Sequence, residues 1–337
     1  MRLLKLYLVS CCFFIYILNG LAQNYQFSQF YAAQTYLNPA FTGASACSRM
    51  TINYRNQWSS IPGTFTTYQV AADHYVKDIN SGVGLLFFSD KSGSGSLKTT
   101  QFSLLYSYNL QINKKFAARA GFSAGGVQRS IDYNSLVFGD QIARGGASSS
   151  VENISQVRTS YFDASVGMLF YSEKSWVGFS INHINQPNQS LLLESSKLPG
   201  DFKLHGGHKF YLEGDESESS RRGTKNSVTL AFNYKNQQKF NQIDLGLYYS
   251  RNYFVIGMWY RGIPIRRPYS WYQNNDALIF LVGLSADKIN IGYSYDVTLS
   301  KLSNVSSGGS HEISITYQIC PKKNKKRRLI LISCPKF

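Results

Sequence analysis

The chain has 337 residues, and although 43% of them are hydrophobic, only 16% are charged, below the usual share of about 25%. After residue 22, no apolar run reaches the ~18–20 residues that a membrane-spanning helix needs. The composition therefore excludes a helical membrane protein beyond that point, whereas one large β-barrel of this length is ordinary. Much of the formal net charge of +16 lies in the C-terminal tail.

Residues 1–22 are typical of a secretory signal peptide. Arg2 and Lys5 supply the positively charged region, residues 6–18 supply the apolar region, and Gly20 and Ala22 are small residues at the expected cleavage site. We therefore expect export and cleavage near Ala22. The alternative, an uncleaved anchor helix, is disfavoured because the apolar stretch is short.

Residues 23–48 lie between the signal peptide and the first predicted strand. We expect them to form an N-terminal segment that is periplasmic or that plugs the barrel. Within it, Asn38–Gly43 (NPAFTG) combines a Pro that fixes φ with a Gly that permits a chain reversal. The motif is either a turn that leads into the first strand, which we favour, or part of a plug that contacts a partner.

From residue 49 onward, apolar and polar residues alternate at a period of two, which is typical of β-strands. In Ser310–Ile319, for example, Ile313, Ile315 and Tyr317 share one face, and the residues between them are polar. Many of the segments have about nine to eleven residues, the length of a tilted strand that crosses a bilayer. The predicted strands cover residues 49–57, 65–75, 81–89, 98–110, 115–125, 161–171, 175–182, 201–212, 225–235, 242–250, 253–262, 276–285, 288–296 and 310–319.

A soluble sheet buries its apolar face, whereas a membrane barrel turns that face to lipid and keeps its polar face in the lumen. The low charge, together with 24 Tyr and 22 Phe, favours the barrel, because aromatic residues are enriched in strands and at membrane interfaces. We predict an all-β fold, a transmembrane up-and-down antiparallel β-barrel of outer-membrane type with about 14 strands, over residues 49–319. A soluble secreted β-sandwich that binds a partner or a glycan is the disfavoured alternative.

Long loops on one side and tight turns on the other are typical of outer-membrane barrels. In the longest predicted loop, Phe138, Asp140 and Gln141 are candidates for binding a partner, and Asp140 and Gln141 suit the cap of a turn equally well. Three longer segments interrupt the strand rhythm, at residues 126–160, 182–200 and 215–223.

Several charged residues fall within or beside the predicted strands. At membrane depth a charge must face the lumen, since an Arg or Lys that faces lipid costs ~2–4 kcal/mol. Lumenal Arg–Asp pairs either brace the wall, which we favour, or hold an inserted peptide of an exported partner. We expect the lumen to be lined by Arg49, Arg55, Arg261 and Asp296, and the remaining charges of this kind are Arg119, Asp73, Asp163 and Asp244.

Residues 320–337 form a basic tail that contains no acid. Its cations suit an acidic periplasmic partner or anionic lipid, and a solvated terminus is an equal alternative. The candidates for such binding are Lys322, Lys323, Lys325, Lys326, Arg327 and Arg328.

Three cysteines, Cys47, Cys320 and Cys334, remain once the signal peptide is removed. Cys320 and Cys334 flank the tail and can close a small loop in an oxidising compartment, with Cys47 left free. Alternatively, Cys47 pairs with one of them. No CxxC pair and no His/Cys cluster predicts a metal site.

Two stretches near the N-terminus, Phe27–Gly43 (FSQFYAAQTYLNPAFTG) and Tyr54–Tyr68 (YRNQWSSIPGTFTTY), resemble the start of the PorP/SprF family. These are outer-membrane proteins of the type IX secretion system of Bacteroidetes, and some serve gliding motility. The order and spacing of the motifs cover essentially the whole mature chain. Further matching motifs are Leu136–Ile142, Tyr161–Asp163, Asn182–Pro187, Leu204–His208, Trp259–Gly262, Gly292–Asp296 and Ser310–Ile313.

The resemblance implies a closed barrel that takes part in protein export or anchors exported surface adhesins. It implies partners among the periplasmic ring components of the secretion system and the exported substrate, and it implies neither catalysis nor a cofactor. We expect a non-enzymatic component of the type IX secretion and gliding machinery, embedded in outer-membrane lipid and exposed at the cell surface. Nucleic acid is excluded as a partner because the protein is exported. The alternative function is a passive outer-membrane pore or a small-solute transporter.

Overall fold

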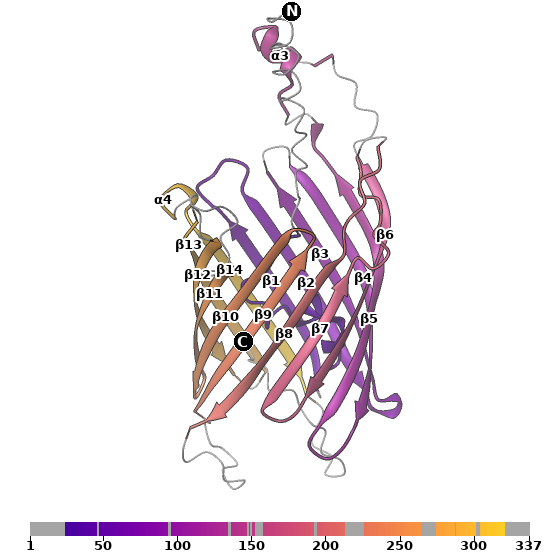
Figure 1. The fold of residues 1–337 in the computed structure, drawn as a ribbon, viewed down its shortest axis with the longest axis vertical. Helices are drawn as coiled ribbons and strands as arrows, with labels where there is room; N and C mark the ends of the chain where they lie inside the picture. The colour runs from indigo at the N-terminus through magenta and orange to yellow at the C-terminus, as the bar shows by residue number, and fades with distance from the viewer. Residues whose placement is uncertain are drawn as a thin grey trace, which may run out of the picture.

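Fourteen strands of the described part of the chain form one closed barrel in which sequence neighbours are paired antiparallel (Figure 1). The all-β, up-and-down barrel predicted from the sequence is confirmed, including its strand count. The predicted signal peptide and all of the basic tail after Cys320 lie outside the described residues. The computed structural model describes residues 24–45, 47–93, 96–133, 136–146, 148, 150–151, 158–191, 194–212, 226–263, 274–286, 288–300 and 304–320.

The barrel closes where the first strand pairs with the last, with Ser48 opposite Ile319 and Gln57 opposite Ser310. Closure satisfies the hydrogen-bonding groups of the strand edges, which a bilayer cannot do. The strands are β1 (Ser48–Gln57), β2 (Phe65–Val76), β3 (Ser81–Ser92), β4 (Leu97–Gln111), β5 (Ala117–Ser130), β6 (Arg158–Tyr171), β7 (Ser175–Asn182), β8 (Asp201–Tyr211), β9 (Ser227–Gln237), β10 (Phe240–Arg251), β11 (Phe254–Ile263), β12 (Asn274–Ser285), β13 (Ile289–Thr298) and β14 (Ser310–Ile319).

The largest departure from the predicted strand ends concerns β5 and β6. The sequence predicts a loop over residues 126–160, but β5 continues to Ser130 and β6 begins at Arg158, with these two residues paired. The extension is polar on its outward face, where Gln128 and Ser160 lie. The apolar stripe that marks a lipid-facing strand therefore ends before the strand does.

The outward and inward faces of the wall are the reverse of those of a soluble protein. In β14, Ile313, Ile315 and Tyr317 point outward and are 42–43% exposed, whereas Glu312 and Ser314 point inward and are fully buried. This arrangement places the apolar face where lipid lies in a membrane and the polar face in the lumen.

The two ends of the barrel differ. The chain enters β1 and leaves β14 at one end, which we call the termini end, and the tight turns at residues 112–116, 172–174 and 252–253 lie there. The connection between β8 and β9 is the longest at that end. The opposite, long-loop end carries most of the longer connections, among them those with α3 (Gly139–Ala143) and α4 (Asn304–Ser307) (Figure 1). In outer-membrane barrels, short turns face the periplasm and longer loops face outside.

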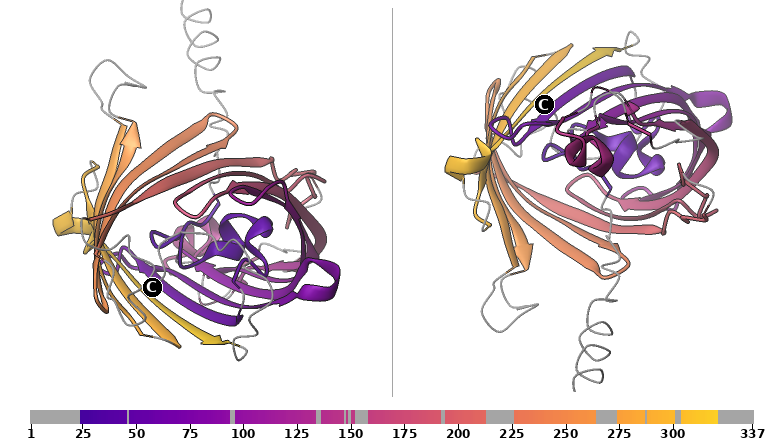
Figure 2. Two further views of the ribbon diagram at one scale, coloured as in Figure 1. Left: turned by 90° about the horizontal axis from the view of Figure 1, so that it is seen from below. Right: turned by 90° about the horizontal axis from the view of Figure 1, so that it is seen from above.

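Residues 24–45, which we call the inner segment, lie inside the barrel (Figure 2). They contain a helical turn, α2 (Gln34–Leu37), and a 3-10 turn, η1 (Pro39–Phe41). A further 3-10 turn, η2 (Lys77–Ile79), joins β2 to β3. No helix among the described residues is long and apolar enough to span a bilayer. The sequence motif Asn38–Gly43, for which a turn into the first strand is the favoured prediction, is buried among the strands within this segment.

A disulfide joins Cys47 to Cys320, with 4.2 Å between the two Cα atoms. Of the pairings that the sequence leaves open, the structure therefore has Cys47 bound to Cys320 instead of a loop closed by Cys320 and Cys334. The bond lies at the termini end, directly beside the seam between β1 and β14, so it links covalently the two strands that close the barrel.

Candidate functional site in the barrel lumen

Five ionisable side chains from neighbouring strands meet inside the barrel, and we call them the charged cluster. Arg55 on β1 lies 2.8 Å from Asp296 on β13 and 3.2 Å from Glu312 on β14. Arg261 on β11 lies 2.9 Å from Asp244 and 3.1 Å from Asp296. Period-two alternation directs these residues inward, because each lies on the polar face of its strand. All five are at most 2% exposed.

The inner segment completes the charged cluster through Ser28 and Gln29. The Ser28 hydroxyl donates to Asp296 at 2.5 Å and accepts from Arg55 at 2.6 Å and from Arg261 at 2.9 Å. The backbone amides of Ser28 and Gln29 donate to the two carboxylate oxygens of Glu312 at 2.6 and 3.0 Å. The inner segment is thus bound to the wall by charge-assisted hydrogen bonds, which are stronger than neutral ones.

The charge balance explains why the backbone amides are needed. Two guanidinium groups face three buried carboxylates, and Arg261 also lies 4.0 Å from the partly exposed Asp276, so negative charge is in excess at this site. A buried charge without partners is strongly unfavourable. Glu312 is the carboxylate that receives two backbone N–H groups in addition to Arg55, so the inner segment compensates the excess charge.

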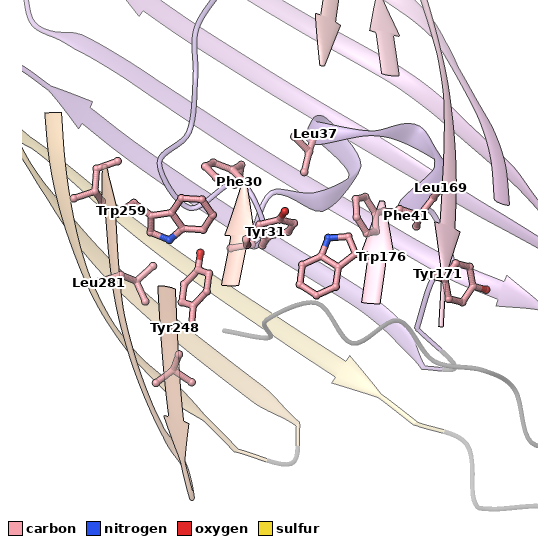
Figure 3. Packing of buried hydrophobic residues seen from close by; sticks show 14 of the residues in the cluster. Phe30, Tyr31, Leu37, Phe41, Leu169, Tyr171, Trp176, Tyr248, Trp259 and Leu281 are labelled. Carbon is pink, nitrogen blue, oxygen red and sulfur yellow. The ribbon is translucent and has the colours of Figure 1, made fainter. Parts of the chain in front are cut away.

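Below the charged cluster, aromatic side chains of the inner segment pack against aromatic side chains of the wall (Figure 3). The ring of Phe30 meets that of Trp259 edge to face at 4.7 Å, and Tyr31 meets Trp176 in the same way at 5.5 Å. The Tyr31 hydroxyl donates to the backbone carbonyl of Gly206 at 3.0 Å. Large rings in such contacts contribute much of the stability of a core, so the segment is packed as well as hydrogen-bonded.

The lower part of the inner segment is fixed near the termini end. The Gly43 amide donates to Asp73 at 2.8 Å, and the same carboxylate lies 2.8 Å from Arg49. The Thr42 carbonyl accepts from Arg119 and from Ser107, each at 2.6 Å. At the other end of the segment, the Asn24 amide donates to Gln237, the last residue of β9, at 3.2 Å. The segment therefore runs through the lumen from the long-loop end to the termini end.

Two glycines make room for this path. A Cβ atom on Gly121 of β5 would lie 2.2 Å from the Ala40 nitrogen, and one on Gly82 of β3 would lie 2.1 Å from the Thr42 carbonyl oxygen. Both collisions would be with backbone, so no side-chain movement relieves them. Glycine in a strand commonly marks such a close approach of another backbone.

Above the inner segment, at the long-loop end, the lumen opens into a cavity of about 470 Å³ that we call the vestibule. Its wall combines aromatic side chains with one buried acid, Asp90, and one cation, Arg129. Two of the aromatic rings, those of Trp58 and Phe65, meet edge to face at 5.2 Å. Such a surface suits an extended peptide, which offers backbone groups and side chains to both kinds of contact. The vestibule is lined by Tyr25, Trp58, Phe65, Asp90, Arg129 and Tyr161, among others.

The structure places the four lumenal residues predicted from the sequence as follows. Arg55, Arg261 and Asp296 meet in the charged cluster, whereas Arg49 lies lower, paired with Asp73. All four are buried inside the barrel. Within the described residues, no group of three or more His, Cys, Asp or Glu side chains is arranged to hold a metal ion.

The three predicted loop residues lie at α3 and hold the loop together. The Phe138 amide donates to the side chain of Gln141 at 2.8 Å. Asp140 accepts from the Ser150 hydroxyl at 2.7 Å and the Val151 amide at 2.9 Å, and these bonds, with Arg144 nearby, lower the pKa of Asp140 to about 2. The cations predicted to bind a partner in the tail, Lys322, Lys323, Lys325, Lys326, Arg327 and Arg328, lie outside the described residues.

The sequence reading misses the residues of the inner segment that touch the wall. The sequence patterns assign no individual role to Ser28, Phe30 or Tyr31, and Glu312 enters only as part of the motif Ser310–Ile313. One signal was available, because Phe27–Phe41 is rich in apolar residues and yet lacks the period-two alternation of the strands. An apolar stretch without strand periodicity, next to a barrel, is a candidate for burial inside it.

Comparison with solved structures finds hydrocarbon channels and porins. The CymD monoaromatic hydrocarbon channel is 12% identical, with 86% of this chain and 93% of that chain covered at a TM-score of 0.47. A TodX monoaromatic hydrocarbon channel deltaS2 mutant is 13% identical (83% and 92% covered, TM-score 0.42), and a Rh. blastica porin mutant is 6% identical (81% and 99%, TM-score 0.35). No curated protein matches the sequence.

One family model matches almost the whole chain, over residues 19–317, and it describes the type IX secretion system membrane protein PorP/SprF. The match includes the inner segment, all five members of the charged cluster and all but the last residues of β14. It agrees with the resemblance seen in the sequence motifs and with a closed barrel whose apolar face points outward. The protein is therefore an outer-membrane barrel that belongs to the PorP/SprF family of type IX secretion system membrane proteins.

Proposed function

We propose that this protein is a closed, non-enzymatic scaffold of the type IX secretion machinery that anchors a secreted surface protein at its long-loop end. The observation that carries the proposal is the inner segment, which occupies the lumen and binds both walls. A barrel filled in this way is suited to hold a partner and poorly suited to conduct solutes.

The strength of the attachment supports this choice over a passive pore. Displacing the inner segment would leave Glu312, Asp296 and both guanidinium groups of the charged cluster without Ser28 and Gln29. It would also remove Phe30 and Tyr31 from the wall tryptophans. Leaving buried polar groups unsatisfied is costly, so the filled state is the stable one.

The vestibule is the site at which we place the surface partner. It opens at the end that faces outside in barrels of this kind, and its rings, Asp90 and Arg129 can contact a peptide inserted from above. The charged cluster deeper in the lumen does not serve this purpose, because it already binds the inner segment. The basic tail (residues 320–337), which follows the last strand in the chain, is suited to an acidic periplasmic component of the machinery.

Two measurements on the full chain test the proposal. In planar bilayers, the wild-type protein is expected to be silent, whereas the Arg55→Ala/Arg261→Ala variant is expected to show intermittent current as the segment loosens. A stable open conductance of the wild type would contradict the scaffold and support the pore.

In cells, an epitope-tagged chain is expected to capture secretion components together with a large surface protein. Trp58→Ala/Arg129→Ala, in the vestibule, should reduce capture of the surface protein only. Arg251→Ala, at the exposed end of β10, is the matched control and should change nothing. Capture of neither class of partner by the wild type would overturn the proposal.

A further inference from the structure

The outer surface of the barrel carries a row of cations near the long-loop end. Hydrogen-bond register places Lys91 on β3 opposite Lys98 on β4, then Ser130 on β5, then Arg158 on β6. All three cations are exposed. They point away from the lumen, because Asp90 and Thr99, the strand neighbours of Lys91 and Lys98, line the vestibule. Arg129, which is paired with the strand neighbour of Arg158, lines it as well. We call Lys91, Lys98 and Arg158 the basic row.

The surface below the basic row changes in steps along the strands. On each strand, the outward residue two positions from the basic row toward the termini end is polar. These residues are Tyr68, Ser89, Thr100, Gln128 and Ser160. Two residues further, Phe87, Phe102 and Phe162 point outward and are 43–58% exposed. Four residues along a strand span about 14 Å, and less in height because the strand is tilted. The basic row thus lies above the apolar band at the depth of lipid headgroups.

The basic row is also unfavourable as it stands. Like charges directly opposite in an antiparallel pair destabilise it, and Lys91 faces Lys98 in this way. No ion pair of these lysines or of Arg158 is found with any acid in the described part of the chain. An anion between them removes the repulsion. The three cations border a cavity of about 640 Å³ on the outer surface together with one acid, Asp132, so cations outnumber acids around the space for such an anion.

We propose that the basic row binds the phosphate groups of a glycolipid of the outer membrane's outer leaflet. The occupant follows from charge and position: it must be anionic, and its acyl chains must reach the phenylalanine row beneath. A phosphorylated glycolipid with its sugar in the cavity meets both needs, and Tyr68, Ser89 and Ser130 offer it hydroxyl groups. The inference concerns the outer surface and is independent of the scaffold function.

The test titrates the purified full chain in detergent with phosphorylated lipid A, with dephosphorylated lipid A and with inorganic phosphate, and counts bound molecules by native mass spectrometry. Each cation near an anionic headgroup contributes about tenfold at most, so Lys91→Gln/Lys98→Gln/Arg158→Gln should weaken binding of phosphorylated lipid A on the order of 100-fold. The matched control, Lys77→Gln/Lys114→Gln/Lys115→Gln, removes three cations at the termini end and should bind like the wild type.

Three results would overturn the proposal: equal losses in both triple variants, equal binding of both forms of lipid A, or displacement of the lipid by inorganic phosphate at the same concentration. A second variant guards against a folding defect. Lys91→Glu converts the repulsive pair into an attractive one, so it should raise the melting temperature in lipid-free detergent and yet weaken lipid A binding. A variant that melts lower, or that binds as tightly as the wild type, contradicts the inference.

Discussion

Two walls of the barrel hold the inner segment by different means. The wall made by β1 and β10–β14 binds Ser28 and Gln29 through buried charges. The wall made by β3–β6 lets the backbone come close, at Gly82 and Gly121, and adds hydrogen bonds to Thr42. The first contact is directional and electrostatic, and the second depends on shape.

The difference shows how a polar lumen can hold a segment firmly. Charged hydrogen bonds fix the position of the segment along the barrel, because Ser28 fits only where two guanidinium groups and a carboxylate converge. Close packing fixes how deeply the segment lies against the opposite wall. Each wall can be weakened separately, so the two contributions can be compared by substitution.

The largest effect is expected at Arg55. Arg55→Ala leaves Glu312 and Asp296 buried without their main counterion, and breaking a buried pair in this way costs about 3–5 kcal/mol. The free energy of unfolding in detergent should fall by that amount. Arg55→Lys keeps the charge but not the planar fork, so it should recover part of the loss. An Arg55→Ala protein as stable as the wild type would show that the charged wall contributes nothing.

The disulfide beside the charged wall should rank second. Cys47→Ser/Cys320→Ser frees the two strands that close the barrel, and the loss of a native disulfide costs about 2–4 kcal/mol. The temperature at which the folded band disappears on a heat-modifiability gel should fall accordingly. Cys334→Ser is the matched control and should melt like the wild type. If the melting temperature of Cys334→Ser falls and that of the double variant does not, the native disulfide involves Cys334 instead of joining Cys47 to Cys320.

The wall that depends on shape is tested at Gly121. Gly121→Ala forces a methyl group against the backbone of η1, and such overpacking costs about 1–3 kcal/mol. The variant should unfold at lower denaturant concentration. Gly126→Ala, on the same strand but with open space around its Cβ, should be neutral. Equal stability of the two variants would rule out a close approach of the inner segment.

The smallest effect is expected outside the barrel, at α3. Because the pKa of Asp140 is lowered to about 2, its ionised form stabilises the loop above the unfolded value of 3.8, and that contribution is lost as the pH falls through about 2. Asp140→Asn should therefore loosen the loop at neutral pH, seen as faster amide exchange of residues 139–143. Barrel melting should not change, and a change there would mean that the loop braces the barrel.

The barrel was predictable because a single rule, period-two alternation with the apolar face outward, applies to every strand. In β14, for example, Ile313, Ile315 and Tyr317 form the outward apolar face. The ends of β5 and β6 were missed because their polar extensions carry no apolar stripe. Arg55, Arg261 and Asp296 could be recognised as lumenal charges, since no other direction is tolerable at membrane depth.

The partners of those charges could not be deduced, because their contacts join residues far apart in the chain. The Ser28 hydroxyl donates to Asp296, 268 residues further along the chain, and the Ser28 amide donates to Glu312, 284 residues further along. No local pattern encodes such a pairing. Likewise, Gly121 looks like any strand glycine until the backbone of Ala40 is placed against it.

The most direct test asks whether the inner segment lies in the lumen of the protein in its own membrane. The Ser314 hydroxyl donates to the end of the Gln29 side chain at 2.7 Å, so cysteines at the two positions face each other across a short gap. Gln29→Cys with Ser314→Cys should be linked by a short bifunctional thiol reagent in intact outer membranes, identified by mass spectrometry of the linked peptides. Gln29→Cys with Ile315→Cys, which points outward, should not. If the first pair fails to link while Cys47 and Cys320 remain joined in the same molecules, the segment lies elsewhere and the filled lumen is wrong.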